Sequence, residues 1–299
     1  MGKRDRKGRE LLLQALLHEG KPLRLVVASG KGGTGKTTVA VNLARTWGGP
    51  VQLLDCDVEA PNTRLFLGGT VLDSQVVTVP VPEVNEALCI GCGECSRFCE
   101  YSALACVAGK AMVFVRMCHS CGGCSLVCPA EAISEVENRI GTIVTSCSGN
   151  ITLLEGILDV GGAMAPPLIR RLKSQMQSGV PAILDSPPGT SCPVVTTMKG
   201  ADFVILVTEP TPFGLHDLTL AVATTRELGL PFGVVVNRLG TGDDRVHSYC
   251  GRENIQVLLE IPDDRRIAEA YSRGELMVDA LPEYAGLFAG LRRELEERR

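Results

Sequence analysis

Short apolar runs alternate with segments of helical periodicity along most of the chain. The apolar runs end at glycine, proline or acidic residues and are short enough to be buried strands. They occupy residues 23–29, 51–54, 151–158, 181–184, 203–207 and 232–236. Apolar residues at helical spacing occupy residues 39–47, 166–177 and 283–299. This alternation predicts an α/β fold, in which a mostly parallel sheet carries helices on both faces.

The first residues differ from the rest of the chain. Residues 1–21 combine a basic start with the apolar segment LLLQALL and end near Gly20, which predicts an amphipathic helix. Because Asp5, Glu10 and Glu19 dilute its positive charge, we expect this helix to pack on the fold instead of binding a membrane surface.

The pattern changes between about residues 67 and 140, where cysteine becomes frequent. Ten of the thirteen cysteines lie between Cys89 and Cys147. The chain is therefore expected to contain an N-terminal extension, an α/β core in two parts, and a small module inserted between those parts. The expected bounds are 1–21 for the extension, 22–80 and 139–299 for the core, and 81–138 for the inserted α+β module.

The inserted module contains one cysteine spacing twice. The pattern C-x₂-C-x₂-C-x₃-C runs from Cys89 to Cys99 and again from Cys118 to Cys128, where Pro129 follows. This is the spacing of bacterial ferredoxins, in which three thiolates of one run and the fourth of the other hold one [4Fe–4S] cube. The first cluster is expected to take Cys89, Cys92, Cys95 and Cys128, and the second Cys99, Cys118, Cys121 and Cys124.

A zinc ribbon is the alternative for these cysteines. Zinc ribbons use two separated C-x₂-C pairs, whereas each run here has three thiolates in close succession and a fourth. The first run departs from the ferredoxin pattern because Glu100 follows Cys99 where proline is expected. The apolar stretches 103–108 and 112–115 are expected to form the few strands of this module, whose core is too small to fold without metal.

A glycine-rich segment follows the first predicted strand. GKGGTGKTT, residues 30–38, contains G-x-x-x-x-G-K-T and precedes the first predicted helix. In this context backbone N–H groups wrap phosphates, the lysine neutralises phosphate charge, and the threonine offers Mg²⁺ a hydroxyl. An ordinary glycine turn is the alternative, which the agreement of strand, loop and helix disfavours. The expected nucleotide contacts are Gly32, Gly33, Thr34, Gly35, Lys36, Thr37 and Thr38.

Acidic residues stand at the ends of two other predicted strands. Asp55 and Asp57 end one strand segment, and Asp185 ends another. Carboxylates at the C-terminal ends of parallel strands face the ligand crevice of an open α/β sheet. Solvated loop acids are the alternative, but the phosphate loop is expected at the same edge of the sheet.

These motifs resemble those of the MinD, ParA, Mrp and nitrogenase iron protein superfamily of ATPases. The resemblance rests on Lys31 directly after the first glycine, on DSPPG from Asp185 to Gly189, and on Asn237 at the end of VVVN. It implies that Lys31 reaches the partner's ATP in a nucleotide-dependent homodimer. It also implies that the Gly189 amide senses the γ-phosphate and that Asn237 contacts adenine.

The resemblance also assigns the catalytic residues. Asp57 is expected to position the water that attacks the γ-phosphate, while Asp55 lies nearer Mg²⁺ or holds its loop. Thr37 and Asp185 are expected to hold the Mg²⁺ shell. Lys31, Lys36, Asp57 and Asp185 are thus the predicted catalytic residues.

One cysteine outside the module has two interpretations. Cys192 follows Asp185 by seven residues, close to where the nitrogenase iron protein places a cysteine that ligates a cluster shared across its dimer. A buried, inert thiol is the favoured interpretation, because free cysteine often packs as a small hydrophobe. A third cluster that bridges two subunits is the alternative.

Composition limits the classes of partner. A net charge of −4 and a pI near 5.7 give no general field that favours nucleic acid or anionic lipid. No apolar run reaches the ~18 residues of a membrane-spanning helix. We therefore expect a cytoplasmic location and no membrane partner. In a reducing compartment, thirteen clustered cysteines favour metal over disulfides.

The order of motifs resembles one subgroup of the superfamily, the MinD-type ATPases with an inserted two-cluster ferredoxin domain. The resemblance to the ATPase covers residues 22–66 and 141 to about 280. It implies ATP, Mg²⁺ and two [4Fe–4S] clusters, and an ATPase that couples nucleotide-driven rearrangement to electron delivery to a low-potential redox metalloprotein. The alternatives are an ATP-dependent carrier or scaffold for clusters or metal ions, and a spatial-organising ATPase that would need a membrane-targeting helix.

Overall fold

A nine-stranded sheet forms the centre of the computed structural model, which describes residues 22–162 and 164–298. The helix expected over residues 1–21 lies outside the described residues. The strand order is β11-β10-β9-β1-β8-β2-β7-β6-β3, and all pairs are parallel up to β7. Only the β7–β6 and β6–β3 pairs of this sheet are antiparallel. The predicted α/β fold with a mostly parallel sheet is confirmed.

The strands of this sheet largely follow the predicted apolar runs. Their bounds are β1 (Arg24–Ala28), β2 (Val51–Asp55), β3 (Thr70–Val84), β6 (Ile133–Ser148), β7 (Ile151–Leu158), β8 (Ala182–Asp185), β9 (Phe203–Thr208), β10 (Phe232–Leu239) and β11 (Val257–Pro262). The central strands β1, β2, β8 and β9 are buried on both faces, which explains their continuous apolar sequences.

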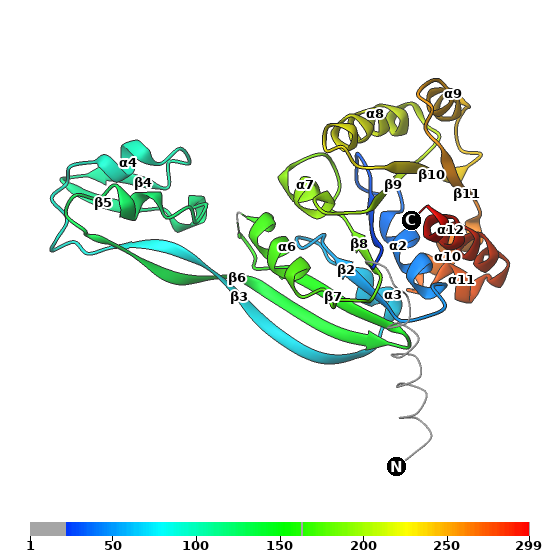
Figure 1. The fold of residues 1–299 in the computed structure, drawn as a ribbon, viewed down its shortest axis with the longest axis horizontal. Coiled ribbons are helices and arrows are strands. Elements are labelled where there is room, and N and C mark those ends of the chain that lie inside the picture. Colours follow the sequence, from blue (N-terminus) through cyan, green and yellow to red (C-terminus); the bar gives the residue numbers. More distant parts are fainter. Residues whose placement is uncertain (1–21, 163, 299) are drawn as a thin grey trace, which may run out of the picture.

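Helices cover both faces of the sheet (Figure 1). Val26 of β1 packs in the same cluster as α6 (Ala165–Ser174), α7 (Cys192–Met198), α8 (Pro212–Glu227) and α9 (Arg245–Arg252). Leu25 and Val27 point to the other face, where α2 (Lys36–Arg45), α11 (Met277–Ala280) and α12 (Ala285–Glu297) pack. The remaining helical segments of the core are α3 (Thr63–Leu67), α10 (Arg265–Ser272) and the 3₁₀ turn η2 (Pro282–Tyr284).

The two edge strands extend beyond the sheet as a two-stranded ribbon. β3 pairs with β6 from Thr70 and Cys147 to Val84 and Ile133, whereas β7 accompanies β6 only over residues 141–148. The rest of the ribbon carries the inserted module away from the core (Figure 1). The expected boundaries at 80/81 and 138/139 thus fall inside continuous strands. Pro80 and Pro82 obscured β3 in the sequence, and an edge strand tolerates them because it has a free side.

The module consists of a hairpin and short helical segments. These are α4 (Glu94–Phe98), β4 (Leu104–Val107), β5 (Lys110–Val113), η1 (Val115–Met117) and α5 (Gly123–Leu126). The second strand lies at 110–113 instead of 112–115. The reason is a tight two-residue turn at Ala108 and Gly109, whose positive φ angles of 50° and 77° suit a primed hairpin turn.

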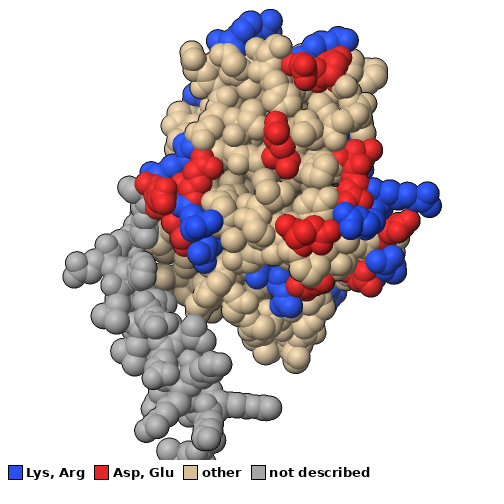
Figure 2. Space-filling model, turned by 90° about the vertical axis from the view of Figure 1, so that its right-hand side faces the viewer, with Lys and Arg blue, Asp and Glu red and all other residues tan. Residues whose placement is uncertain are grey.

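The face opposite the module carries charges of both signs. Figure 2 shows acidic and basic side chains in mixed groups around a largely uncharged centre. Such a surface provides no single-sign field on this face of the described residues, in keeping with the small net charge.

Candidate nucleotide site and cysteine module

The phosphate loop joins β1 to α2 through backbone that glycine adopts most readily. Gly33 and Gly35 have φ angles of 79° and 96°, and Gly35 is the N-cap of α2. A Cβ on Gly35 would lie 2.3 Å from Nδ2 of Asn237, so this position also needs glycine for space. The unpaired N–H groups at the start of α2 are therefore available to phosphate.

A cavity of about 380 Å³ opens beside the loop. Its lining includes seven of the predicted nucleotide contacts, namely Gly32, Gly33, Gly35, Lys36, Thr37, Thr38 and Asn237. Thr34 and Gly189 do not line it: Thr34 is buried, and the Gly189 N–H donates to the carbonyl of Ser29 at 3.0 Å. The predicted residues thus come together from the loop after β1, from α2 and from β10.

The opposite wall of the cavity comes from the segment after β11. It includes Pro262, Asp263, Asp264, Ile267 and Tyr271. Tyr271 stacks at an angle on Phe66, with 4.7 Å between ring centroids, and no local motif marks it. Pro262, Ile267 and Tyr271 give this wall an apolar part, as a nucleotide base requires.

Two oxygen donors of the kind that Mg²⁺ prefers lie together where α2 begins and β8 ends. The Thr37 hydroxyl donates to Oδ2 of Asp185 at 2.6 Å. Asp185 is buried, and its Oδ1 has no hydrogen-bond partner among the described residues. Burial, and then the charge of Asp55, raise the pKa of Asp185 well above its usual value. A divalent cation would remove that penalty, so this donor set fits Mg²⁺.

Lys36 is the buried cation of the site. It is 7% exposed, and burial lowers its pKa, although Asp185 and Asp57 partly oppose that shift. Within the part of the chain that the structure describes, its Nζ donates only to the carbonyl oxygen of Lys31, at 3.4 Å. A phosphate oxygen would therefore be a better partner than the one Lys36 has here.

The two acids after β2 have different environments. Asp55 is fully buried and accepts hydrogen bonds from the N–H groups of Asp57, Asn62 and Thr63 and from the Thr63 hydroxyl, so it holds this loop. Asp57 is half-buried and lines the cavity. Burial, and then the charge of Asp55, raise the pKa of Asp57 to about 6.

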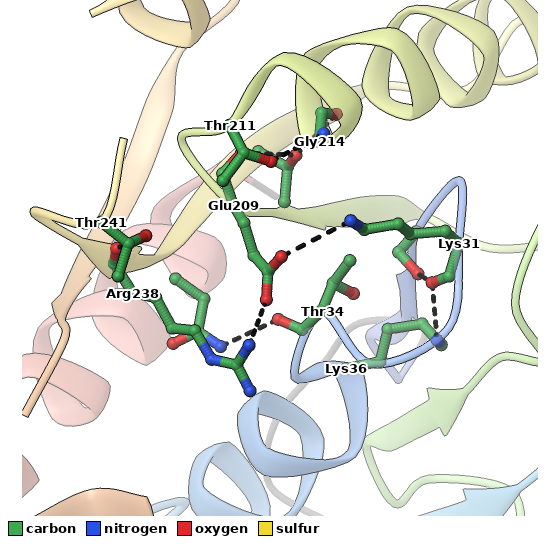
Figure 3. Close-up of polar contacts among 11 residues, drawn as sticks. Lys31, Thr34, Lys36, Glu209, Thr211, Gly214, Arg238 and Thr241 are labelled. Carbon is green, nitrogen blue, oxygen red and sulfur yellow. Dashed lines mark hydrogen bonds and ion pairs between the residues drawn. The ribbon is translucent and has the colours of Figure 1, made fainter. Parts of the chain in front are cut away.

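Lys31 lies outside the cavity in an ion-pair network that the sequence did not predict. Its Nζ lies 3.5 Å from Oε2 of Glu209, and Nη1 of Arg238 lies 2.7 Å from Oε1 of the same carboxylate. Figure 3 shows the two cations approaching Glu209 from opposite sides. Glu209 is 8% exposed, and Arg238 has an unusual positive φ of 55°. Strand order creates this network, because β10, β9 and β1 are neighbours.

The module brings the eight predicted cluster cysteines together in two groups. One cavity is lined by Cys89, Cys92, Cys95 and Cys128, and a second by Cys99, Cys118, Cys121 and Cys124. Each group takes three cysteines from one run and one from the other, as the ferredoxin spacing predicts. The residues present therefore fit two [4Fe–4S] cubes.

Backbone amides support three of these thiols. The N–H groups of Ala103 and Ala132 donate to Sγ of Cys99 and Cys128, each at 3.3 Å. The N–H of Ser120 donates to Sγ of Cys118 at 3.4 Å. Such bonds favour thiolate sulfur and orient it toward a cluster.

The other cysteines do not share one environment. Cys192 is exposed at the start of α7, so the expectation of a buried packing thiol is wrong for this residue. The reason is that its helix begins in the loop after β8, outside the core. Cys56 and Cys250 are buried, and Cys147 is half-buried. Cys106 is exposed and lines the first cysteine cavity.

The described residues contain neither a compact site for a single metal ion nor a membrane-spanning helix. In residues 22–162 and 164–298, no group of three or more His, Cys, Asp or Glu side chains has the geometry to hold a single metal ion. No helix in the described part of the chain is long and apolar enough to cross a membrane.

Comparison with known proteins agrees with the nucleotide site. The family model described as the CobQ/CobB/MinD/ParA nucleotide binding domain matches residues 25–277. The uncharacterized protein MJ0579 of Methanocaldococcus jannaschii is 30% identical over 256 residues, which cover 84% of this chain and 90% of that protein. The iron-sulfur cluster carrier protein of Aquifex aeolicus is 25% identical over 277 residues, which cover 87% of this chain and 62% of that protein.

The fold has similar solved structures. The septum site-determining protein MinD of Pyrococcus horikoshii, complexed with Mg-ADP, superposes with a TM-score of 0.56 at 21% identity, covering 93% of this chain and 97% of that one. A MinD of Pyrococcus furiosus gives the same TM-score and identity, with 93% and 99% covered. At this identity the likeness concerns the fold alone.

Proposed function

The chain belongs to the CobQ/CobB/MinD/ParA family of nucleotide-binding proteins, and from this premise we propose that it couples ATP hydrolysis to electron transfer through two [4Fe–4S] clusters. Membership of the family implies that the chain binds and hydrolyses ATP. One observation carries the coupling: the two groups of four cysteines stand on a ribbon that is continuous with the sheet of the ATPase.

The nucleotide site assigns a role to each polar side chain. Lys36 binds phosphate oxygens, and Thr37 and Asp185 hold Mg²⁺, which neutralises charge on the phosphates when bound. Asp57 lines the cavity on the side of Asn62 and orients the attacking water. Asn237 contacts the base while its amide stays bonded to the loop at Thr34 O, 2.8 Å away.

Lys31 and the dimer form the second part of the proposal. Lys31 is 3.5 Å from Glu209 and outside the cavity of its own chain, so it is free of its own phosphate site. We propose a nucleotide-dependent homodimer in which Lys31 leaves Glu209 and meets the partner's ATP. The MinD/ParA membership and the position of Lys31 support this assignment.

A continuous set of contacts links the Asp57 loop to the ribbon. The N–H of Leu158, at the end of β7, donates to the carbonyl of Val58 at 2.8 Å. The next residue, Asp159, donates its N–H to the carbonyl of Ile140 at 2.9 Å and pairs with both Nε and Nη2 of Arg139, at 2.9 and 3.2 Å. Movement of the loop beside the γ-phosphate therefore reaches β6 where the ribbon leaves the core.

The module has the surface of a docking element. Ile90 is 68% exposed and Leu126 is 86% exposed, and these residues lie in the two cysteine runs. Large exposed apolar side chains beside the cluster sites suit a transient protein contact. We propose a low-potential redox metalloprotein as the partner, since bacterial-type clusters work at low potential.

A second function has one observation in its favour. The chain resembles proteins named iron-sulfur cluster carriers, and the resemblance to the carrier of Aquifex aeolicus covers 87% of this chain. Cys92 and Cys121, one in each cysteine group, are exposed. An ATP-dependent carrier of iron–sulfur clusters is therefore the alternative, since transfer needs a thiol that an acceptor can displace.

The experiment that separates the two functions uses anaerobic protein with clusters in place. Electron transfer predicts about eight irons per chain that survive repeated reduction and oxidation. A carrier predicts loss of iron to an apo-ferredoxin when Mg-ATP is added, with the acceptor gaining it. Stable clusters that never reduce, or a native preparation without iron, contradict the electron-transfer proposal.

A further inference from the structure

The cavity assigned to the first cluster contains a fifth thiol. Cys106, on β4, lines it together with Cys89, Cys92, Cys95 and Cys128. Four cysteines complete the ligand set of a [4Fe–4S] cube, so Cys106 has no place in the assignment made above. Its thiol therefore needs a role of its own.

The hairpin holds Cys106 against the loop that carries two cluster ligands. Its Sγ donates to the carbonyl of Gly91 at 3.3 Å. A Cβ on Gly91 would lie 2.2 Å from the carbonyl oxygen of Gly109, so the loop and the hairpin turn are in direct contact. A Cβ on Gly93 would lie 3.8 Å from Cβ of Cys106. Gly91 and Gly93 flank Cys92, which is itself exposed.

The internal repeat provides a comparison within the same molecule. Cys118 follows Cys89 by 29 residues, Gly122 follows Gly93 by 29, and Glu135 follows Cys106 by 29. Glu135 lines the second cavity, and a Cβ on Gly122 would lie 3.2 Å from its Oε1. Equivalent positions beside the two cavities thus carry a thiol in one half and a carboxylate in the other. Among residues 22–162 and 164–298, no fifth cysteine lines the second cavity.

We infer that Cys106 is an exchangeable ligand of the first cluster, which alternates with Cys92 on one iron. This inference rests on the proposed [4Fe–4S] clusters and deepens their function. In the exchange, the Cys106 thiol releases its proton to solvent as its sulfur bonds to the iron. The bond from that iron to Cys92 breaks, and the Cys92 sulfur takes up a proton. No electron is gained or lost.

The chemistry explains why only one half has this property. Thiolate is a soft ligand that iron–sulfur clusters prefer, whereas the carboxylate of Glu135 is a hard ligand that they do not. The first cluster can therefore release Cys92 and keep four thiolate ligands, because Cys106 replaces it. The second cluster has no thiol that could replace a ligand in this way. The two clusters are consequently unequal, and the first is the one suited to ligand exchange with a partner.

The test compares cysteine variants after anaerobic reconstitution. Iron and sulfide are counted, and the reduced protein is examined by electron paramagnetic resonance. We expect about eight irons in the wild type, in Cys106→Ala and in Cys92→Ala. We expect about four in the double variant Cys92→Ala/Cys106→Ala and in Cys121→Ala, which is the matched control in the second half. The resonance of Cys92→Ala should show an altered first cluster.

A converse variant tests the same idea in the second half. Adding Glu135→Cys to Cys121→Ala should restore the count from about four irons to about eight. If Cys92→Ala and its double variant hold equal iron, whatever the amount, the inference is wrong. A wild-type protein without iron would instead overturn the proposed clusters, so the two failures are distinguishable.

Discussion

Replacing Asp57 with Asn should stabilise the nucleotide-free protein at neutral pH while it impairs hydrolysis. Burial and the charge of Asp55 raise the pKa of Asp57 from an ordinary 3.8 to about 6. That difference corresponds to a penalty of at most about 3 kcal/mol for the ionised carboxylate. Because the side chain is only half-buried, we reduce the expected gain to about 1–2 kcal/mol.

The pH dependence of this gain has a defined sign. Between pH 3.8 and about 6 the folded protein keeps the Asp57 proton that the unfolded chain has lost, so the wild type loses stability as pH rises. The penalty is complete above pH 6 and absent below pH 3.8. Asp57→Asn avoids this penalty. The free energy of unfolding of the variant should therefore exceed that of the wild type most at pH 8, and by roughly half as much at pH 5.

The assay is thermal unfolding without nucleotide or divalent cation, followed by circular dichroism. A gain of about 1–2 kcal/mol should raise the Tm by about 2–6 °C at pH 8. Asp73→Asn, at an exposed carboxylate on β3, is the matched control and should leave Tm unchanged. With Mg-ATP, kcat of Asp57→Asn should fall about 10²- to 10⁴-fold. A variant less stable than the wild type at pH 8, or equally stabilised at both pH values, would refute the reasoning.

Three further predictions concern charged groups of the nucleotide site and of the ribbon. Lys36→Ala should abolish ATP hydrolysis and leave the iron content unchanged, because the cysteine cavities lie in the module that the ribbon carries away from the core. Loss of iron in this variant would contradict separate sites. Glu209→Gln should bind Mg-ATP about five- to tenfold more tightly in calorimetry, since it removes a carboxylate that pairs with Lys31; weaker binding would count against that network. Arg139→Ala should reduce any effect of Mg-ATP on the cluster reduction potential, because it breaks the ion pair with Asp159. The control is Arg226→Ala, which breaks the pair with Glu253 far from the ribbon and should leave that effect unchanged.

Most of the predicted nucleotide contacts line one cavity because the spacing within the loop is fixed by short-range geometry. Gly35 and its neighbours occur in one loop, and the strand and helix on either side determine where their N–H groups point. The Glu209 network was missed because its members lie on β10 and in the segments after β9 and β1, and no local pattern specifies the order of these strands in the sheet. Arg238 stands beside the predicted Asn237, and a strand-end acid at Glu209 was the signal that could have indicated it.

The ribbon was missed for a different reason. β3 is mostly exposed and β6 mixes exposed with buried residues, and neither strand has the continuous apolar sequence by which buried strands are recognised. Their pairing with each other, and not burial, defines them. The exposure of Cys192 likewise depends on where α7 begins relative to the core, which residue type alone does not specify.

The central proposal is that nucleotide binding and paired iron–sulfur clusters act as one device. An anaerobic redox titration of the full chain, with and without Mg-ATP, tests it most directly. The account predicts about eight irons per chain that reduce reversibly at low potential, with a midpoint that shifts when Mg-ATP binds. An iron-free protein, or clusters whose titration is identical with and without Mg-ATP, would contradict it.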